Sequence, residues 1–445
     1  MTEAAAVKEE TTTKADAPKL EKAKAAPKKE AASKSNEAQK ILEQRAALFK
    51  AHVFKQTGHR PIEPSFSTHP HIDSGSLVIN TLVGGSPTKD GKGQVCPGYP
   101  RRKITEIYGP ESSGKTTIAL CAAADVQRKG GQVLFLDFEH SLHHGYAQTI
   151  GVKFDGITFQ HFSPDTMEEG LKHIGLAIAL GFDLIIVDSV AAMIPAKELV
   201  KDIQDDSKVG AVAKKLAETL PKIVNWLATH PKTGSGETKK TDPTKPGCAL
   251  ILLNQERAVI NTGGSHGPDT NTAGGKALKF YCAVRLRFQK WKTEVIEKTD
   301  PLSGKKKKFP YGTITGVTVV KAKMDSRQGQ SASIFIRYGF GLDNVYSVIE
   351  TGVATGVLKK DGAYFSFGEN RFQGRDKMRA FFMENPKAFD EAKKLVSAAV
   401  VSAGGTAISE EELSDGDAVL ESIADLGLDD DDSESTEESI SVDDA

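Results

Sequence analysis

The sequence predicts an α/β protein built around a mostly parallel central sheet. Residues 103–108 resemble a buried strand that leads into a Gly-rich loop, and a helical pattern follows at 116–126. Further short apolar runs occur at 133–136, 184–187 and 249–253, as expected for strands that are covered on both faces. Helical patterns lie between these runs and supply the connections between parallel strands.

The loop at 109–117 has the spacing G-x-x-x-x-G-K-T of a phosphate-binding loop. A strand before it and a helix after it are the context that this motif requires. Glycines let backbone N–H groups surround an anion, Lys115 can reach the β- and γ-phosphates, and the Thr116 hydroxyl can hold Mg²⁺. The sequence therefore predicts a nucleoside triphosphate site formed by Gly109, Pro110, Glu111, Ser112, Ser113, Gly114, Lys115, Thr116 and Thr117.

The other elements divide the chain into five parts. The first residues are mostly Ala, Lys, Glu, Thr and Pro, with almost nothing to bury, and are predicted to be disordered. Apolar residues at helical spacing between 36 and 54 predict a lone helix before a Pro-rich linker. The alternating runs 284–288 and 314–320 favour antiparallel strands at the sheet edge. The expected parts are a disordered extension (1–36), the helix and linker (37–71), the core (72–344), a small α/β domain (345–403) and an acidic disordered tail (404–445).

The charge is unevenly distributed over the 445 residues, although the net charge is only -1. Residues 410–445 hold 16 acidic residues and no Lys or Arg, so the remainder has an excess of about 15 positive charges. A basic body with an acidic end suggests a polyanionic partner and an internal competitor for that partner. A tail that only aids solubility is the alternative.

The cysteines and the apolar runs indicate the compartment. Four cysteines, at positions 96, 121, 248 and 282, show neither zinc-ligand spacing nor a disulfide framework, which fits a reducing environment. We find no apolar signal segment and no run of about 18 apolar residues. The expectation is a soluble cytoplasmic protein without a membrane partner.

Polar residues at the ends of predicted strands are candidates for chemistry. Asp188 ends an apolar strand, where a carboxylate can position Mg²⁺ through water; a helix N-cap is the alternative. Glu139 follows another strand end, and Gln255 ends the strand before a loop rich in Gly, Thr and Asn. Lys321 and Lys323 alternate on one strand and so face the same side, as ordinary surface lysines on an edge strand also would.

The amino-acid sequence of the phosphate loop resembles that of bacterial RecA recombinases, position for position. Several motifs in one fixed order are more specific than any one of them. The resemblance covers roughly residues 37–403 and implies a RecA-type P-loop ATPase core with an N-terminal polymerisation helix and a small C-terminal module. The further motifs, in the order of the family, are Leu136–His140, Ile185–Ala192, Leu253–Gln255, Gly274–Tyr281 and Val319–Lys323.

The resemblance implies catalytic residues in addition to Lys115. The family counterpart of Glu139 polarises the attacking water, and general-base help is typically worth about 10²–10⁴-fold in rate. The counterpart of Gln255 senses the γ-phosphate and transmits the nucleotide state to the loop behind it. The counterparts of Lys321 and Lys323 reach across a filament interface to the triphosphate of the neighbouring subunit.

The resemblance also implies ATP as the nucleotide. Tyr146 matches the family residue that stacks on adenine, and Asp188 matches the second nucleotide motif of the family. This chain departs from the family at His143-His144, where Asp-Pro is usual and the Asp contacts the base. The two histidines have no other ligands at useful spacing, so a metal site at this position is not expected.

Two segments, 201–210 and 256–275, resemble the DNA-binding loops of the family. Their small residues let backbone amides meet phosphates, and an apolar side chain can wedge between bases. Composition alone favours plain surface loops, and the order of the motifs reverses that preference. The inserted segment 233–246 and the run Lys305–Lys308 have no assigned counterpart; the lysines fit either a solvated turn or a secondary DNA contact. The expected DNA-binding residues are Lys214, Arg257, Ile260, Gly274 and Gly275.

These features together predict an ATP-dependent protein of homologous recombination and DNA repair, of the kind that also acts in the SOS response to DNA damage. It is expected to form filaments on single-stranded DNA with ATP and Mg²⁺, to pair that strand with homologous duplex and exchange strands, and to act as a DNA-dependent ATPase. The alternatives are a ring-forming DNA motor with the same core and a mediator paralogue that does not exchange strands.

Overall fold

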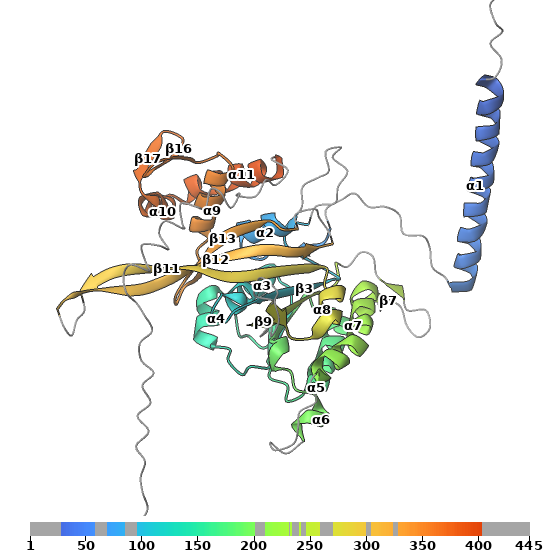
Figure 1. Ribbon diagram of the computed structural model, residues 1–445, viewed down its shortest axis with the longest axis horizontal. Helices are drawn as coiled ribbons and strands as arrows, with labels where there is room; N and C mark the ends of the chain where they lie inside the picture. The colour runs from blue at the N-terminus through green and yellow to red at the C-terminus, as the bar shows by residue number, and fades with distance from the viewer. Residues whose placement is uncertain are drawn as a thin grey trace, which may run out of the picture. The chain divides into compact units, whose positions relative to one another are not determined.

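The structure is a computed structural model of the chain (Figure 1). It describes residues 28–57, 69–84, 96–200, 210–230, 232–233, 240–241, 246–258, 270–299, 304–323 and 328–402. The chain divides into two units, Met1–Ser65 and Phe66–Ala445, and each is treated separately. Within the described residues no helix is both long and apolar enough to cross a bilayer.

The first unit contains one long helix, α1 (Lys28–Thr57). It begins earlier than the predicted start near residue 36, because the preceding Lys, Glu and Ala are good helix formers. Leu42, Leu48 and Phe49 on this helix are 63%, 71% and 70% exposed. Within the described residues of this unit, these apolar side chains therefore remain open to water.

The second unit is organised around a mixed sheet, which confirms the predicted fold class. Ten described strands form the order β14-β13-β12-β11-β3-β9-β6-β4-β5, with β10 paired to β9. The pairs from β11 through β3, β9, β6 and β4 to β5 are parallel, and β12, β13 and β14 add antiparallel strands at one edge. The strands are β3 (Ile104–Gly109), β4 (Val133–Asp137), β5 (Phe159–Phe162), β6 (Leu184–Asp188), β9 (Ala249–Ala258), β10 (Thr270–Thr272), β11 (Val284–Thr299), β12 (Lys306–Ala322), β13 (Ser331–Arg337) and β14 (Gly341–Leu342).

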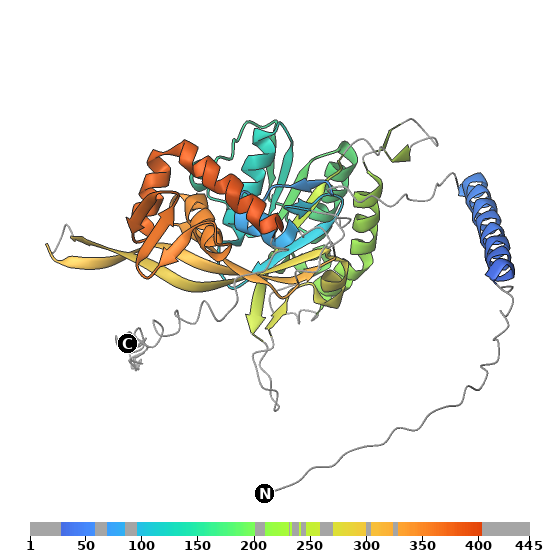
Figure 2. The ribbon, with the colours of Figure 1, turned by 90° about the horizontal axis from the view of Figure 1, so that it is seen from above.

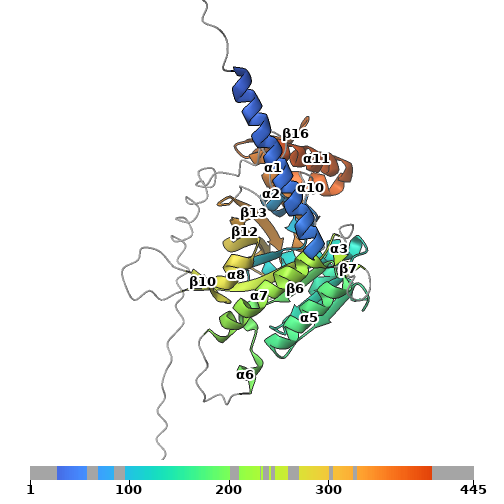
Figure 3. The same ribbon diagram turned by 90° about the vertical axis from the view of Figure 1, so that its right-hand side faces the viewer.

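Helices cover both faces of this sheet because successive strand residues point to opposite sides. Val133 and Phe135 of β4 belong to one apolar cluster, whereas Leu134 and Leu136 belong to the other. The first cluster is closed by α2 (Leu77–Gly84), α3 (Lys115–Arg128) and α4 (His144–Ile150). The second is closed by α5 (Met167–Leu180), α7 (Ala211–Thr229) and α8 (Gly275–Tyr281), and Figure 3 shows α5 beside α7. Two short turns, η1 (Val190–Ala192) and α6 (Ala196–Leu199), follow β6.

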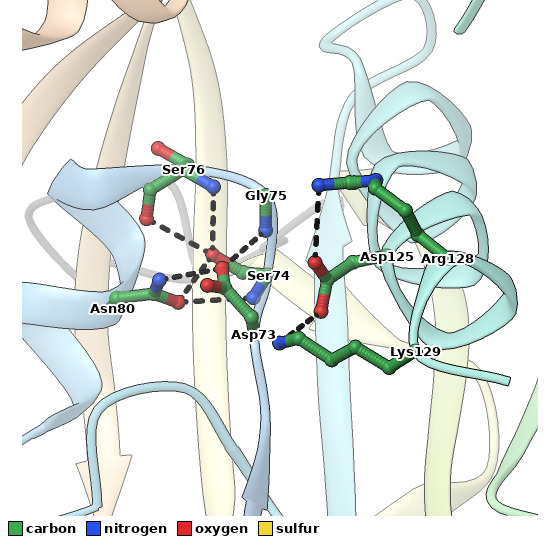
Figure 4. A network of polar contacts seen from close by, with 8 residues as sticks. All are labelled: Asp73, Ser74, Gly75, Ser76, Asn80, Asp125, Arg128 and Lys129. Carbon is green, nitrogen blue, oxygen red and sulfur yellow. Dashed lines mark hydrogen bonds and ion pairs between the residues drawn. The ribbon is translucent and has the colours of Figure 1, made fainter. Parts of the chain in front are cut away.

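A polar network within residues 73–80 holds the turn that leads into α2 (Figure 4). The Asp73 carboxylate accepts the Gly75 N–H at 2.8 Å and the Asn80 amide at 2.6 Å, and Asn80 Oδ1 accepts the Ser74 hydroxyl at 2.7 Å. Gly75 has φ +77°, and a Cβ there would lie 2.8 Å from Cβ of Cys121 on α3. Only glycine allows this approach, so the turn at Gly75 lies close against α3. The short strands β1 (His71–Ile72) and β2 (Tyr99–Pro100) pair beside it.

The C-terminal residues build a small module with its own apolar core. Val348, Ile349, Leu358, Phe365 and Phe382 are buried together in it. Its three-stranded antiparallel sheet has the order β15-β16-β17. The elements are α9 (Asn344–Ala354), β15 (Lys359–Asp361), β16 (Tyr364–Phe367), β17 (Asn370–Gln373), α10 (Arg375–Glu384) and α11 (Pro386–Ser402).

The β11–β12 hairpin is much longer than the sequence predicts. The predicted strands cover 284–288 and 314–320, but pairing continues to Thr299 opposite Lys306, with two bulges on the way and a third near its base. The added strand residues include Thr, Val, Ile, Phe and Tyr, which suit pleated backbone. Figures 1 and 2 both show the hairpin extending away from the sheet. Two further short strands, β7 (Lys232–Thr233) and β8 (Lys240–Thr241), pair antiparallel at the start of and within the inserted segment 233–246.

Candidate active site

The phosphate loop connects β3 to α3 and depends on two close approaches. A Cβ on Gly109 would lie 2.0 Å from the Phe288 carbonyl oxygen, and one on Gly114 would lie 1.9 Å from Cδ1 of Ile336. Ser112 adopts φ 56°, and the Ser113 hydroxyl donates to the Pro110 carbonyl at 2.8 Å. This backbone leaves the helix N-terminus open to an anion, as the motif predicts.

Lys115 lies at the start of α3 and is only 9% exposed. Its ammonium donates to the carbonyls of Pro110 at 2.7 Å and Gly109 at 3.2 Å. Burial lowers the pKa of this lysine, and attraction to Asp188 and Glu139 opposes that shift. The ammonium is therefore held at the loop, close to where an anion bound by the loop amides would lie.

The Thr116 hydroxyl and the Asp188 carboxylate meet directly. The hydroxyl, at the start of α3, donates to Asp188 Oδ2 at 2.7 Å. Asp188 ends β6, so two residues far apart in the sequence meet here. Burial raises the pKa of Asp188 to about 6, and the negative charges of Glu139 and Asp137 add to this rise. A buried carboxylate among others is stabilised by a cation, and hard oxygen donors beside a phosphate site suit Mg²⁺.

Mg²⁺ fits this donor set without a cage of protein ligands. Among the residues that the structure describes, no group of three or more His, Cys, Asp or Glu side chains could hold a metal by itself. Mg²⁺ usually takes one or two protein oxygens and completes its shell with substrate phosphates and water. The pair Thr116 and Asp188 satisfies that requirement.

Glu139 is held by Gln255 and by Ser189, which directly follows β6. Gln255 does not end its strand as predicted, because β9 continues to Ala258 and pairs there with β10. The Gln255 amide donates to Glu139 Oε1 at 2.9 Å, and the Ser189 hydroxyl donates to the same oxygen. The strand order β9-β6-β4 brings these distant residues together. The sequence identifies Glu139 and Gln255 as candidates, whereas Ser189 is missed, because it differs in no visible way from the rest of the run after Asp188.

A buried network links this end of β9 to the start of α8. Asn254 donates its amide to Glu106 at 2.9 Å and to the Ala273 carbonyl at 2.8 Å, and it accepts the Gln255 N–H at 3.0 Å. Glu106 is fully buried and also pairs with Arg285 at 2.5 Å. Both ends of the segment 256–273 are thereby attached to the residues beside Glu139.

A cavity of about 270 Å³ opens beside the phosphate loop. The Tyr146 hydroxyl lies 2.9 Å from the Thr117 hydroxyl on its wall, which brings the predicted adenine-stacking residue to the site. The sequence does not identify the residues of the opposite wall. Nothing in the edge strands β12 and β13 distinguishes their site residues from other polar or apolar positions. The lining residues are Ser112, Gly114, Lys115, Thr116, Thr117, Tyr146, Thr313, Ile336 and Tyr338.

The histidines that depart from the family pattern cap and flank α4. The Nδ1 atom of His143 accepts the Tyr146 N–H at 3.0 Å, so His143 serves as the N-cap of this helix. His144 lies 3.3 Å from His161, whose ring also approaches Asp137 at 3.6 Å. Of the predicted loop residues, Gly109, Pro110, Glu111 and Ser113 do not line the cavity.

Lys321 lies in the C-terminal part of β12, and Lys323 directly follows the last strand residue, so the two are not both within the strand as predicted. Their ammonium groups are 5.9 and 5.4 Å from the centre of the Phe280 ring, so both face the same side. Lys321 donates to the carbonyls of Lys279 at 2.6 Å and Phe280 at 2.9 Å, which caps the C-terminus of α8. Neither lysine lines the cavity of its own chain.

The expected DNA-binding residues are only partly described. Lys214 is exposed on α7, and Arg257 lies in β9 opposite Asn271 of β10. Gly274 and Gly275 have φ +91° and +68° and begin α8, where a Cβ would press on α7 at 2.8 to 2.9 Å. Ile260, and residues 201–209 of the first loop, lie outside the described residues.

Comparison with known proteins places this site in a family. The model of the RecA N-terminal domain matches residues 70–343, and that of the RecA C-terminal domain matches residues 346–401. A Protein RecA of Nostoc punctiforme is 35% identical over 348 residues, which cover 77% of this chain and 85% of the relative. A Protein RecA of Arthrospira platensis is 36% identical over 76% of this chain and 80% of its own length. A Protein RecA of Corynebacterium glutamicum strain R is 34% identical over 82% of this chain and 88% of its own length. The chain belongs to the RecA family.

Proposed function

We propose that this chain assembles on single-stranded DNA with ATP and Mg²⁺, pairs that strand with homologous duplex, and exchanges strands. Membership of the RecA family makes it a DNA-dependent ATPase of recombination and repair. The observation that carries the finer proposal is the contact between Glu139 and Gln255 at 2.9 Å, beside the phosphate loop. It joins a candidate hydrolytic carboxylate to the strand that leads into the segment 256–275.

ATP hydrolysis in this scheme uses residues of one chain for binding and activation. The loop amides and Lys115 hold the β- and γ-phosphates, and Tyr146 contacts the base from the cavity wall. Glu139 orients the attacking water and accepts its proton. Thr116 and Asp188 hold Mg²⁺, which supplies positive charge to the phosphate oxygens.

Lys321 and Lys323 act on the nucleotide of a neighbouring copy. Thr315 on β12 touches the phosphate loop through the Ser113 carbonyl at 3.2 Å. Lys321 is six residues further along the same strand, which corresponds to roughly 20 Å at the usual rise per residue. A lysine side chain cannot span that distance, so these ammonium groups serve a site that another chain brings to them. There they stabilise the charge of the transition state.

The same contacts explain how DNA could regulate hydrolysis. Asn254 holds Gln255 at one end of the segment 256–273 and Ala273 at the other. Gly274 and Gly275 then begin α8, and its last carbonyls accept Lys321. A strand of DNA bound to that segment, with Lys214, Arg257 and Ile260, can therefore reposition both Gln255 and Lys321. DNA binding and ATP turnover are coupled through this one continuous stretch of chain.

Self-assembly is supported by α1. Its exposed Leu42, Leu48 and Phe49 form an apolar surface in a unit that cannot bury it alone. A neighbouring copy in a filament is the partner that we assign to it, in a cytoplasmic protein. The filament interface would then bring Lys321 and Lys323 to the next nucleotide.

Electron microscopy of the full chain tests this function. With single-stranded DNA and a slowly hydrolysed ATP analogue, we expect helical filaments, and we expect few without nucleotide. Closed rings would instead support a DNA motor, and separate monomers would support a mediator. A strand-exchange assay with homologous and heterologous duplexes completes the test, because only a recombinase distinguishes them.

A further inference from the structure

Two neighbouring residues near the end of β9 send their side chains to opposite faces of the sheet, as successive strand residues do. The Gln255 amide donates to Glu139 Oε1 at 2.9 Å, on the side of the nucleotide site. Glu256 instead meets Arg287 of β11. The Arg287 Nε donates to Glu256 Oε2 at 3.3 Å, and its Nη2 lies 2.9 Å from Glu256 Oε1. Neither residue of this ion pair lines the nucleotide cavity, so the chemistry proposed above leaves the pair without a role.

The ion pair crosses the sheet at the place where its middle strand ends. Arg287 lies beside Tyr108 of β3, and Gln255 lies beside Gly109, the last residue of that strand. Beyond Gly109 the chain turns into the phosphate loop, so no residue of β3 separates Glu256 from β11. The backbone of Glu256 pairs with β10 instead. The two side chains therefore connect β9 to β11 where the backbone ladder between these strands has ended.

A second glutamate–arginine pair anchors the residue that precedes Gln255. Glu106 of β3 is fully buried, accepts the Asn254 amide at 2.9 Å and pairs with Arg285 at 2.5 Å. Asn254 in turn accepts the Gln255 N–H at 3.0 Å. Arg285 and Arg287 are two residues apart on β11 and so share a face. The residues before and after Gln255 are thus both held on this face, which directs the Gln255 side chain to the other one.

Burial makes the outer ion pair more than a surface contact. The Glu256 side chain is 7% exposed, and that of Arg287 is 31% exposed. A carboxylate this buried is costly to leave without a partner, and a guanidinium that presents two nitrogens also fixes its orientation. Without Arg287, the charge of Glu256 can be stabilised only if the strand moves it toward water. Such a movement would carry the adjacent Gln255 with it.

We propose that Glu256 and Arg287 are positioning residues for ATP hydrolysis. Together with the anchor on the other side of Gln255, their ion pair fixes β9 so that the Gln255 amide reaches Glu139. Loss of the pair displaces Gln255 and releases Glu139 from its orientation toward the attacking water. Nucleotide binding is kept, because the pair lies outside the cavity. This inference rests on the proposed function, because it assumes that Glu139 activates that water.

Kinetic measurements on Arg287→Gln test the proposal. With saturating single-stranded DNA, kcat should fall by about tenfold, since misplacement by about 1 Å can cost about 10²-fold. The KM for ATP should stay within about twofold of the unmodified value. The control is Asp183→Asn, which breaks a partly buried ion pair of 2.8 Å with Arg101 at the start of β6. We expect the control to lower the melting temperature without a comparable loss of kcat. An equal loss of kcat in both variants, or a rise in KM alone, would overturn the proposal.

A double-mutant cycle with Gln255→Ala shows whether the ion pair acts through Gln255. If it does, Arg287→Gln should cost little further kcat once the Gln255 amide is absent, because both changes remove the same contact. Glu256→Gln repeats the cycle without leaving a buried carboxylate unpaired, and it decides the result if Arg287→Gln melts too low to assay. Losses of kcat that multiply would overturn the positioning role alone. If Gln255→Ala by itself left kcat unchanged, the proposed use of Gln255 would fail, and this inference would fail with it.

Discussion

The two ends of the central sheet differ in how complete they are. At the end where β3 enters the phosphate loop, side chains of β6, β9, α3 and the turn after β4 already contact one another, through Thr116 with Asp188 and Gln255 with Glu139. At the other end of β12, Lys321 and Lys323 gather beside Phe280, which is 67% exposed. One end is assembled by folding, whereas the other presents cations and an aromatic ring to solvent.

This difference indicates a division of labour. Carboxylates buried near a phosphate loop must be positioned precisely, and a single folded chain achieves this through adjacent parallel strands. Under the proposed function, Lys321 and Lys323 lie far from the loop of their own chain and serve the nucleotide of a second chain. On that proposal, ATP hydrolysis is expected chiefly in the assembled protein. Substitutions can therefore break one end while the other remains intact.

The largest effect is expected from Lys115→Ala. This change removes the cation that meets the β- and γ-phosphates, so ATP hydrolysis should fall by at least about 10²-fold, and strand exchange should be lost. Because burial disfavours the charged form of Lys115, the melting temperature should stay close to that of the unmodified chain. ATPase assays, with Lys172→Ala as the control variant, measure the loss of hydrolysis. Turnover near the unmodified rate would show that the loop does not hold the nucleotide.

Glu139→Gln separates binding from turnover at the same end. The amide keeps the shape of the side chain but cannot accept a proton, so hydrolysis should fall by about 10²–10⁴-fold. Affinity for an ATP analogue and filaments on DNA should persist. Assays of ATP hydrolysis test the expected loss of turnover, and nucleotide-binding measurements test the retained affinity. An unchanged hydrolysis rate would remove Glu139 from the role of base.

The double change of Lys321 and Lys323 to Ala breaks the opposite end. DNA-stimulated hydrolysis should fall by about 10²-fold, while an isolated chain should still bind a nucleotide analogue. Because Lys321 also caps α8, a circular dichroism spectrum should confirm that the fold is kept. A variant that hydrolyses ATP normally would argue against a contribution from these lysines.

Mixing the two classes of variant sharpens the comparison. An interface that takes its carboxylate from the lysine variant and its lysines from Glu139→Gln contains one complete site. Some ATPase activity should therefore return, with a maximum near equal amounts. If the two proteins co-assemble on DNA and no mixture is active, the site is not shared between chains.

The parallel core can be predicted because its signals are local. Each buried strand is an apolar run followed by a polar residue, so 133–136 and 184–187 are recognisable as strands from the sequence alone. The length of β12 cannot be predicted in this way, because strands outside the core have no continuous apolar pattern. Their pairing depends on the opposite strand rather than on their own sequence.

The candidate site divides in the same way. Lys115, Glu139 and Asp188 stand at strand ends or in a fixed motif, and the sequence identifies them. Tyr338 and Ser189 reach the site only through the packing of other strands, and no spacing links them to the loop. The distance between Lys321 and the phosphate loop likewise requires the register of β12. Motifs therefore identify the chemistry, whereas the assembly of the site requires the fold.

The smallest effect is expected from the acidic residues 410–445, which lie outside the sheet in the sequence. The acidic residues of 410–445 are expected to compete with DNA phosphate, chiefly for duplex near basic residues such as Lys359, Lys360 and Arg371 of the C-terminal module. Removing residues 409–445 should tighten duplex binding by roughly threefold to tenfold at low salt. It should also reduce the Mg²⁺ needed for strand exchange, because free Mg²⁺ otherwise masks the tail. The gain should shrink as salt rises, since such attraction is screened over roughly 10 Å at 0.1 M. Anisotropy measurements on both forms across a salt series decide this point, and equal affinities at low salt would leave the tail a role in solubility alone.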